Sequence, residues 1–441
     1  MGGGTVPCMA AANPVPQRLL DFLSQGWTDP DRTPPAPDAR VAAWRERRRR
    51  LAAEFPDRTL VVRSGHEVVR NGTTSYSFRA HSDFIYLCGA DEPDAVLVIH
   101  PGGDAELFVH APHPRGDVQW FTDAARSPLW AGPQPVPEEL AIRFGLPVRP
   151  LTELPGDFVG AGVAETDAPE FGIEVSKAVA RLRLVKDPFE LASLRDAAAA
   201  SLLGHEELRA AIPEAIRAGG ERWLEGTFLR RCSTSGAGPG YWPIVGAGAH
   251  ACILHWHRND GPVRHGDVVL VDAAVENRDH YTADITRTYP TGATFTPAQQ
   301  SVFDIVQAAH DAAIASIKPG DGFHDSQDVA WTVLVDGLID LGVFRPEQRA
   351  EALDPNTMLH RRYTLHRTSH MLGLDVHDSQ VIATEYRAGT LSPGMVFTIE
   401  PGLYLQDNDD TVPAPLRGIG VRIEDDVVCT PNGCDVLTSA G

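Results

Sequence analysis

"DVVLVDAAVENRDHYTADITRTYP", residues 267–290, consists of an apolar run, a polar turn and a second apolar run, which predicts two antiparallel strands. Asp272 interrupts the first run and Asp284 lies in the second, so we expect the two carboxylates to face each other across the strand pair. An acid within an otherwise buried strand is costly unless it is paired or bound to a cation. This stretch therefore predicts a β-rich domain built around a charged site.

The same pattern recurs twice downstream. Glu400 in "VFTIEPG" and Glu424 in "VRIEDD" each place one acid in or at the end of an apolar run. Four carboxylates in such places indicate one cation site, because four separate buried acids would be far more destabilising. A site this negative suits two divalent ions about 3.5 Å apart. Mn²⁺ fits oxygen ligands best, with Co²⁺, Zn²⁺ or Fe²⁺ as substitutes.

Three histidines lie close together in "HRTSHMLGLDVHD", residues 366–378. They indicate a metal cage, a proton relay, or chance in a chain with 17 histidines. "LGLDVHD" alternates like a strand, which would set His370 and His377 too far apart to share one metal. A helical i, i+4 pair of His366 and His370 is the alternative, although no HExxH pattern supports it.

The flanking sequence predicts two domains and an arm. Residues 1–38 are rich in Pro, Gly and Ala and predict a loose arm. Residues 39–183 alternate short apolar runs with helical stretches, which predicts an α/β domain. A helix with Asp187 as cap, Pro188 at its first position and Glu190 three residues after the cap opens the second domain, residues 184–441.

Individual helices have clear signals. Residues 41–55, "VAAWRERRRRLAAEF", have apolar residues at helical spacing, and we expect their arginine run to form a solvated face. Thr296 and Gln299 predict a capping box at the start of a second helix, and "SQDVAWTVLVDGLIDLG" predicts a third. "GLDVHD", "GMVFTIEPGLYL" and "GVRIEDDVVC" read as three further strands.

Composition restricts the classes of partner. The chain has 441 residues and a formal charge of −20, which argues against nucleic acid as a ligand. No run approaches the roughly 18 apolar residues of a membrane span, and the first residues lack a secretory pattern, so we expect a cytoplasmic protein that does not bind membranes. The six cysteines are scattered; Cys429 and Cys434 flank the turn "TPNG" and are expected to face each other, reduced, across a hairpin.

Five stretches together resemble the metallopeptidases of the pita-bread fold, and most closely the aminopeptidase P family: "ILHWHRN", "LVDAAVENRDHYTADITRT", "HRTSHMLGLDVHD", "FTIEPGLYL" and "RGIGVRIEDD". The likeness extends to "SDFIYLCGADEPDAVLVI" and so covers most of the chain from about residue 40. It implies an α/β (α+β) chain, with an N-terminal α/β domain followed by a C-terminal pita-bread catalytic domain.

The resemblance implies a set of five metal ligands. Asp272 would chelate one metal with both oxygens, and Asp284 and Glu424 would bridge the pair. His370 and Glu400 would complete the shell of the other metal. Of the three clustered histidines, His370 is then the ligand.

The resemblance also implies an activity: removal of an N-terminal residue from a peptide with proline in second position, by a hydroxide that bridges two metals. Glu400 would take the proton of that water and pass it to the leaving nitrogen. His377 would donate to a substrate carbonyl or oxyanion, His255 of "ILHWH" would line the same side, and His366 would help to form the proline pocket.

Four further residues are candidates around the site. Arg422 lies two residues before Glu424, on the same face of a strand, and is expected to contact the metal carboxylates. Tyr404 and Arg387 match family positions near the cleft. Trp120 matches a tryptophan that reaches a neighbouring subunit, with Trp130 as a rival, and a homo-oligomer (dimer or tetramer) is therefore expected.

Two alternatives remain open. A prolidase restricted to Xaa-Pro dipeptides would use the same five ligands. A non-catalytic binding module with this fold would be expected to have lost ligands, whereas all five are present.

Overall fold

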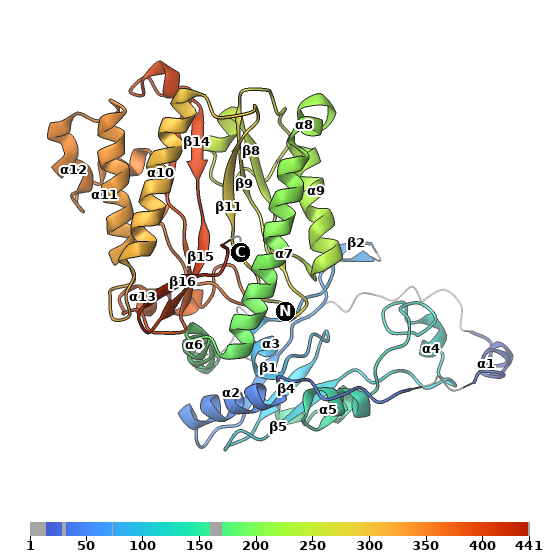
Figure 1. The fold of residues 1–441 in the computed structure, drawn as a ribbon. Helices are drawn as coiled ribbons and strands as arrows, with labels where there is room; N and C mark the ends of the chain where they lie inside the picture. The colour runs from blue at the N-terminus through green and yellow to red at the C-terminus, as the bar shows by residue number, and fades with distance from the viewer. Residues whose placement is uncertain (1–14, 29–31, 73, 159–169, 440–441) are drawn as a thin grey trace. The chain divides into compact units, whose positions relative to one another are not determined.

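The computed structural model describes residues 15–28, 32–72, 74–158 and 170–439, and the chain divides into two compact units, residues 1–182 and 183–441 (Figure 1). The helices and strands up to the junction are α1 (Gln17–Leu23), α2 (Val41–Glu54), β1 (Leu60–Arg63), β2 (Val69–Asn71), β3 (Thr74–Ser75), α3 (Ser82–Cys88), β4 (Val96–Ile99), β5 (Ala105–Val109), α4 (Gln119–Thr122), α5 (Pro137–Phe144), β6 (Val148–Pro150) and α6 (Glu170–Leu184), which runs across the junction. Those of the second unit are α7 (Pro188–Ala210), α8 (Ile212–Glu214), α9 (Gly220–Ser235), β7 (Gly238–Pro239), β8 (Ile244–Ala247), β9 (Val268–Asp272), β10 (Val275–Glu276), β11 (Thr286–Pro290), α10 (Pro297–Ser316), α11 (Asp325–Asp340), α12 (Arg349–Leu353), α13 (Ala383–Arg387), β12 (Val396–Ile399), β13 (Gly402–Leu405), β14 (Ile419–Arg422), β15 (Asp425–Thr430) and β16 (Gly433–Val436).

The first unit is built on a sheet in the order β1-β4-β5-β6. β1, β4 and β5 are antiparallel neighbours, and β6 joins β5 in parallel. The apolar runs expected to be strands form β1, β4 and β5, and Val61, Val96, Val98 and Phe108 make one buried cluster on this sheet. This unit is an α/β structure, as the sequence predicted.

The arginine run of α2 is not a fully solvated face. Arg47 and Arg48 are buried and donate to the carbonyl oxygens of Tyr86 and Leu87, in the last turn of α3. A helix leaves its last carbonyl groups without intrahelical partners, and cations there are favourable. The prediction of a solvated face was therefore wrong for these two residues. The carbonyl groups that require a donor belong to α3, about 40 residues further along the chain, so the local sequence of α2 does not indicate them.

The described part of the N-terminal arm is more ordered than predicted. Residues 17–23, "QRLLDFL", form α1. The indole of Trp27 packs edge-on against Trp120, with ring centroids 5.2 Å apart, and Arg115 donates to the carbonyl oxygen of Trp27. These contacts hold the segment against its own unit, which a composition-based reading could not detect.

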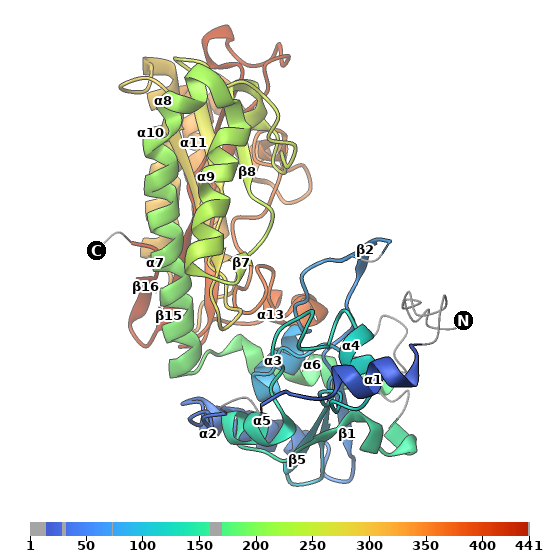
Figure 2. The same ribbon diagram turned by 90° about the vertical axis from the view of Figure 1, so that its right-hand side faces the viewer.

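Paired helices flank the strands of the second unit. α7 and α9 run side by side, as do α10 and α11 (Figures 1 and 2). Leu208 of α7 and Phe228 of α9 share a core with Val245 of β8 and Val271 of β9. The predicted caps are present: Asp187 with Glu190 starts α7, and Thr296 with Gln299 starts α10.

The strands of the second unit break at the acids. β9 ends at Asp272; Glu400 separates β12 from β13, and Glu424 separates β14 from β15. The breaks occur because the chain changes partner: β12 pairs with β15, whereas β13 pairs with β14. Two predicted single strands are therefore two strands each, and the carboxylates sit at the points of exchange.

Two other strand predictions were wrong in detail. Asp272 is registered opposite Thr286, and Asp284 precedes β11, so the two acids are not directly opposite each other, although both carboxylates lie 2.6 Å from the hydroxyl of Tyr241. The segment "GLDVHD" bends and forms no strand. Its bend follows from Asp378, whose backbone N–H returns to the carbonyl of Met371 and whose side chain binds Lys186 at 2.8 Å.

Cys429 and Cys434 face each other in the β15–β16 hairpin, as predicted, and neither is part of a disulfide in this structure. Cys8 lies outside the described residues. Within the described ranges, none of the helices combines the length and apolarity needed to cross a bilayer.

Candidate metal centre

The five predicted ligands come from three places in the second unit that the fold brings together. Asp272 ends β9 and Asp284 lies two residues before β11. The backbone N–H of Glu424, between β14 and β15, donates to the carbonyl of Thr286 at the start of β11. This bond joins the two parts of the unit that carry the acids. Asp272, Asp284 and Glu424 therefore lie where the sheet of β9 and β11 meets the strands β14 and β15.

His370 is carried by an extended segment along β12. The N–H groups of Thr398 and Glu400 donate to the carbonyls of His370 and Thr368, both at 2.9 Å, and the N–H of Leu372 donates to Val396. This antiparallel ladder sets His370 beside Glu400. The imidazole and the carboxylate are thus fixed by backbone pairing.

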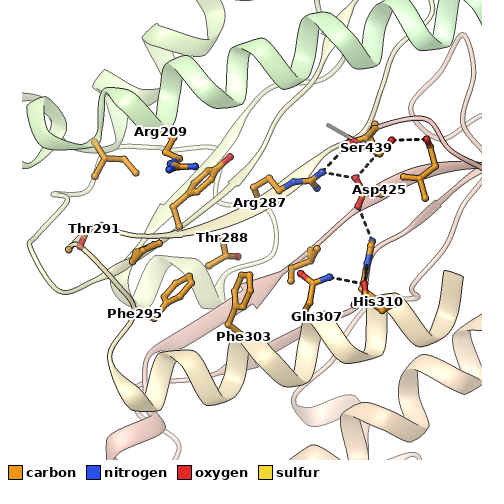
Figure 3. A pocket seen from close by; sticks show the side chains of 18 of the residues that line it. Arg209, Arg287, Thr288, Thr291, Phe295, Phe303, Gln307, His310, Asp425 and Ser439 are labelled. Atoms are coloured by element: carbon orange, nitrogen blue, oxygen red, sulfur yellow. Dashed lines mark hydrogen bonds and ion pairs between the residues drawn. The ribbon is translucent and has the colours of Figure 1, made fainter. Parts of the chain in front are cut away.

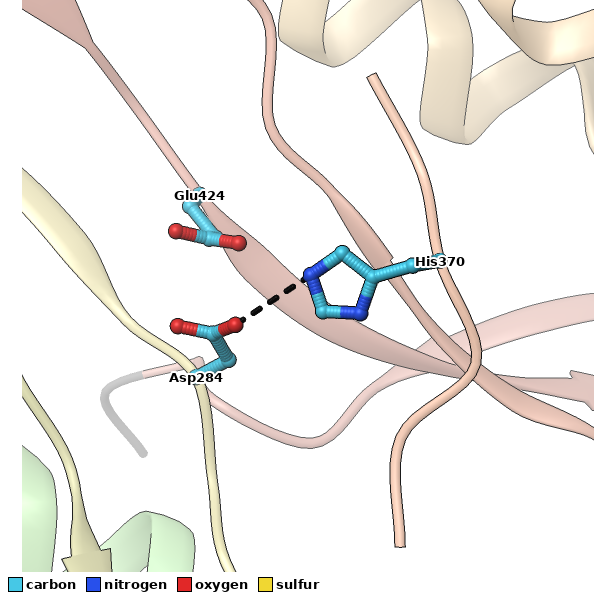
Figure 4. A group of neighbouring side chains, drawn as sticks. All are labelled: Asp284, His370 and Glu424. Atoms are coloured by element: carbon cyan, nitrogen blue, oxygen red, sulfur yellow. Dashed lines mark ion pairs between the residues drawn. The ribbon is translucent and has the colours of Figure 1, made fainter. Parts of the chain in front are cut away.

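Asp284, His370 and Glu424 form the centre of the cluster (Figure 4). Each offers one ligand atom, and these atoms lie within 4.8 Å of one another. Nε2 of His370 lies 3.3 Å from Oδ2 of Asp284 and 3.4 Å from Oε1 of Glu400. One donor atom from each side chain therefore faces a common point.

Tyr241 ties Asp272 into this cluster and was not identified from the sequence. Its hydroxyl lies 2.6 Å from Oδ1 of Asp272 and 2.6 Å from Oδ1 of Asp284. The residue sits in "GPGYWP", between β7 and β8, where nothing local marks it. Its role depends on carboxylates 31 and 43 residues away.

Arg422 is the buried cation of the site. Its guanidinium donates to Oδ2 of Asp272 at 2.6 Å and to the hydroxyl of Tyr404 at 2.9 Å. Tyr404 in turn lies 2.6 Å from Nε2 of His366, whose Nδ1 is 3.2 Å from Oε2 of Glu400. A continuous polar chain thus runs from Asp272 to Glu400 through three of the predicted accessory residues.

The charge balance of the cluster fits divalent cations. Burial, together with the charges of Asp284, Glu400 and Asp272, raises the pKa of Glu424 well above its usual range. Burial and Asp272 raise the pKa of Asp284 to about 6, against the opposing effect of His370. Arg422 and His370 do not neutralise four buried carboxylates, so an oxygen-rich set of this kind matches hard divalent ions.

Glu400 has a different environment. Burial alone would raise its pKa, but the hydrogen bond from His366 and the charges of His370 and Arg422 lower it to about 2. Thr398 also donates to Oε1 at 3.4 Å. Glu400 is therefore held ionised, with both oxygens oriented.

The three accessory histidines surround the cluster. The rings of His370 and His377 are 4.5 Å apart, so the argument that an extended segment separates them was wrong. Burial and the charge of His370 lower the pKa of His377, and burial and Arg422 lower that of His255. Both rings are still partly open to solvent, which leaves their nitrogens accessible to a bound peptide.

Two predicted residues lie apart from the cluster. Arg387 ends α13, and its Nε is buried without a hydrogen-bond partner. Within the described residues, no hydrogen bond joins it to the four acids or to His370. Trp120 is buried in the first unit against Trp27 and Phe121, whereas Trp130 is 65% exposed. Of the two tryptophans, Trp130 is the one with free surface.

A cavity of about 930 Å³ lies on another face of the same strands (Figure 3). Its walls include Phe295, Phe303 and Ile314. Three of its charged or polar groups pair with one another: Arg287 donates to Asp425, which also contacts His310 at 3.1 Å. The described residues that line it include none of the five predicted ligands. This cavity is not the candidate reaction site.

Comparison with known proteins gives a consistent result over nearly the whole chain. Residues 192–431 match Metallopeptidase family M24, and residues 44–161 match Aminopeptidase P, N-terminal domain. The chain is 41% identical to Xaa-Pro aminopeptidase 2 of Streptomyces coelicolor, over 96% of this chain and 93% of that protein, and 34% identical to Xaa-Pro aminopeptidase of Escherichia coli, over 90% and 94%.

Solved structures agree. Aminopeptidase P from E. coli with the inhibitor Pro-Leu superposes with a TM-score of 0.79 at 29% identity, over 91% of this chain and 95% of that one. Pseudomonas aeruginosa aminopeptidase PepP gives 0.77 at 30% identity, over 91% and 95%.

Proposed function

The chain belongs to metallopeptidase family M24, with the two-domain architecture of aminopeptidase P, and on this premise we propose that it is a metal-dependent Xaa-Pro aminopeptidase. It removes an N-terminal residue that precedes a proline. The single observation that carries the proposal is the buried cluster of four carboxylates and His370, where the sheets of the second unit meet. A non-catalytic module would have no use for so costly an arrangement.

Two divalent cations, held by Asp272, Asp284, His370, Glu400 and Glu424, would supply a water of lowered pKa and polarise the scissile carbonyl. We propose Mn²⁺ as the native ion, because four of the five side chains offer oxygen. Tyr241 and Arg422 orient the carboxylates from behind, by the hydrogen bonds described above.

Glu400 acts as the proton carrier. Its carboxylate accepts a proton from the attacking water and delivers it to the proline nitrogen as the peptide bond breaks. His366 and Thr398 fix its two oxygens, so the proton is taken at a defined place.

His377 and His255 bind substrate. With lowered pKa values both rings are neutral near pH 7 and present an N–H donor. His377 donates to a substrate carbonyl, whose negative charge grows during the attack. His366, between Tyr404 and Glu400, borders the place where the proline ring would lie.

The test is a peptide panel. Chelated protein reconstituted with Mn²⁺ is expected to release arginine from Arg-Pro-Pro, and cleavage of Gly-Pro alone would favour the prolidase instead. Glu400→Ala should abolish turnover while the protein stays folded. Retained activity in that variant would refute the assigned proton carrier. Metal analysis of purified protein identifies the ion, and light scattering tests the predicted dimer or tetramer.

A further inference from the structure

The loop that carries His255 wraps around a single buried carboxylate. Glu221, in the first turn of α9, has a side chain with no exposed surface. Its Oε1 accepts from the N–H of Ala247 and from Nδ1 of His250, both at 2.8 Å. Its Oε2 accepts from Nε1 of Trp256 at 2.8 Å and from the N–H of Gly261 at 2.7 Å.

These four partners hold both oxygens of the Glu221 carboxylate in place. Two backbone amides and an indole can only donate, so both oxygens of Glu221 act as acceptors. The imidazole of His250 stacks on the indole of Trp256 at 3.9 Å, which closes the loop over the acid.

Close approach at two glycines makes this arrangement specific. The backbone N–H of Glu221 donates to the carbonyl of Gly261 at 2.9 Å. A Cβ at Gly261 would lie 2.5 Å from the ring of His250, and one at Gly220 would lie 2.5 Å from the carbonyl of Gly261. Gly220 also has a φ of +58°, a conformation that glycine adopts without strain.

The other side of the loop rests on the strands of the metal centre. Cys252 packs in a buried cluster with Tyr404, and its carbonyl accepts from Gln406 at 2.9 Å. One helical turn beyond Glu221, Glu225 accepts from Asn259 of the same loop at 3.0 Å. The loop is thus held between α9 and the strand that carries Tyr404, with His255 at its exposed bend.

We infer that Glu221 is a positioning residue for the peptidase reaction: its four hydrogen bonds fix loop 247–261 and so place the His255 imidazole at the edge of the metal centre. The inference rests on the proposed function, since His255 matters only if a peptide binds there. The hydrogen bonds described for Glu221 all run to loop 247–261, and none of them reaches the five predicted ligands. Leu254, the residue before His255, packs against the buried cluster that contains Tyr404, which agrees with this placement.

Glu221→Gln is the direct variant, because in either orientation the amide nitrogen would face at least one N–H group that can only donate. We expect kcat on Arg-Pro-Pro to fall about 10- to 100-fold, since a misplacement of about 1 Å can cost about 100-fold. Bound metal per folded molecule should be unchanged. Trp256→Phe keeps the ring on His250 and removes one donor, so it should give a smaller loss without risk to folding.

Coupling to His255 decides between positioning and plain stability. If Glu221 acts through His255, Glu221→Gln combined with His255→Ala should be no worse than the more impaired single variant, within about twofold. Leu224→Ala, a cavity variant in the same helix, is the control: it lowers the melting temperature and leaves kcat per folded molecule unchanged.

Losses that multiply in the double variant, or normal kcat in Glu221→Gln, would overturn the inference. Normal kcat in His255→Ala would overturn it as well. Each of these results leaves the wild-type activity intact, whereas a wild-type protein inactive on Arg-Pro-Pro would refute the proposed function itself.

Discussion

The guanidinium of Arg422 lies 2.6 Å from Oδ2 of Asp272, although 150 residues separate them in the chain. The same group donates to Tyr404 and to the hydroxyl of Thr286 at 3.0 Å. Its planar fork serves three acceptors on different strands at once, and the ammonium group of lysine lacks this fixed geometry. Arg422 therefore does more than balance charge.

Arg422→Lys should accordingly lower kcat/KM by about 10- to 100-fold, the usual cost of losing an outer partner of metal ligands. Steady-state kinetics at saturating Mn²⁺ would measure it. Arg417→Lys, which alters a pair with the exposed Asp410, is the matched control and should retain full activity. Equal kinetics in both variants would contradict the bridging role.

Tyr241→Phe should weaken metal binding about tenfold, because Asp272 and Asp284 both lose their neutral donor. A titration of activity against Mn²⁺ concentration in chelated protein would show the midpoint shift. Tyr289→Phe removes a hydroxyl that lies 3.3 Å from His205, elsewhere in the unit, and should leave the midpoint unchanged.

Tyr241 also shows where sequence reasoning ends. Caps such as Asp187 with Glu190 were predictable because donor and acceptor lie within one turn. The acids in β9 and beyond β14 were recognisable because burial of a charge is costly whatever the fold. The partners of those acids are not local, since Tyr241 meets Asp284 only after the sheets form.

The strand breaks have the same explanation. "GMVFTIEPGLYL" is apolar throughout, and nothing in it says that Val396–Ile399 and Gly402–Leu405 pair with different strands. That choice depends on which neighbours the whole unit supplies. The arginines of α2 were misread for the same reason, because their acceptors belong to α3.

Metal removal should destabilise the protein more at pH 8 than at pH 5. Burial, together with the charge of Asp272, raises the pKa of Asp284 in the folded protein to about 6, above its value in the unfolded chain. The stability that protonated Asp284 contributes is therefore lost as the pH rises from about 4 to 6. His370, whose ion pairs with Asp284 and Glu400 outweigh burial and raise its pKa to about 9, loses stability as pH rises from about 6.5 to 9. In the metal-bound protein, cations would take the place of the proton on Asp284 and of the proton on His370, so this loss would be confined to the metal-free form.

Differential scanning fluorimetry with Mn²⁺ and with chelator, from pH 5 to 8, would measure this gap in melting temperature. The gap should widen with pH in wild-type protein. Asp284→Asn should show a smaller gap, because it removes both a ligand and a repelling charge. A gap that stays constant with pH would contradict the electrostatic account.

His205 should make the protein less stable as the pH falls, whereas Asp284 and His370 make the metal-free protein less stable as the pH rises. It is buried, contacts the carbonyl of Ala273 at 3.0 Å, and burial together with Arg287 lowers its pKa to about 4. The unfolded chain therefore takes up a proton first, and stability is lost as pH falls from about 6.5 to 4, by on the order of 3 kcal/mol. Urea unfolding at several pH values should show that the free energy of unfolding of His205→Gln falls less steeply below about pH 6.5 than that of the wild type. The same pH dependence in both proteins would refute this role of His205.

The bend that brings His377 to His370 depends on a buried ion cluster. Asp378 contacts Arg183 and, at 2.8 Å, Lys186, and both cations are buried. Lys186→Met leaves Asp378 with one cation fewer, and breaking a buried pair costs about 3–5 kcal/mol. Urea unfolding would measure this loss, and kcat should fall with it because the His377 loop loosens. Asp378→Asn in the same background removes the uncompensated charge and should restore part of the stability.

Gly373→Ala should have the same effect on kcat as Lys186→Met, because its Cβ would lie 2.3 Å from Oδ2 of Asp378. Wild-type kcat in Gly373→Ala would show that the bend does not set the position of His377.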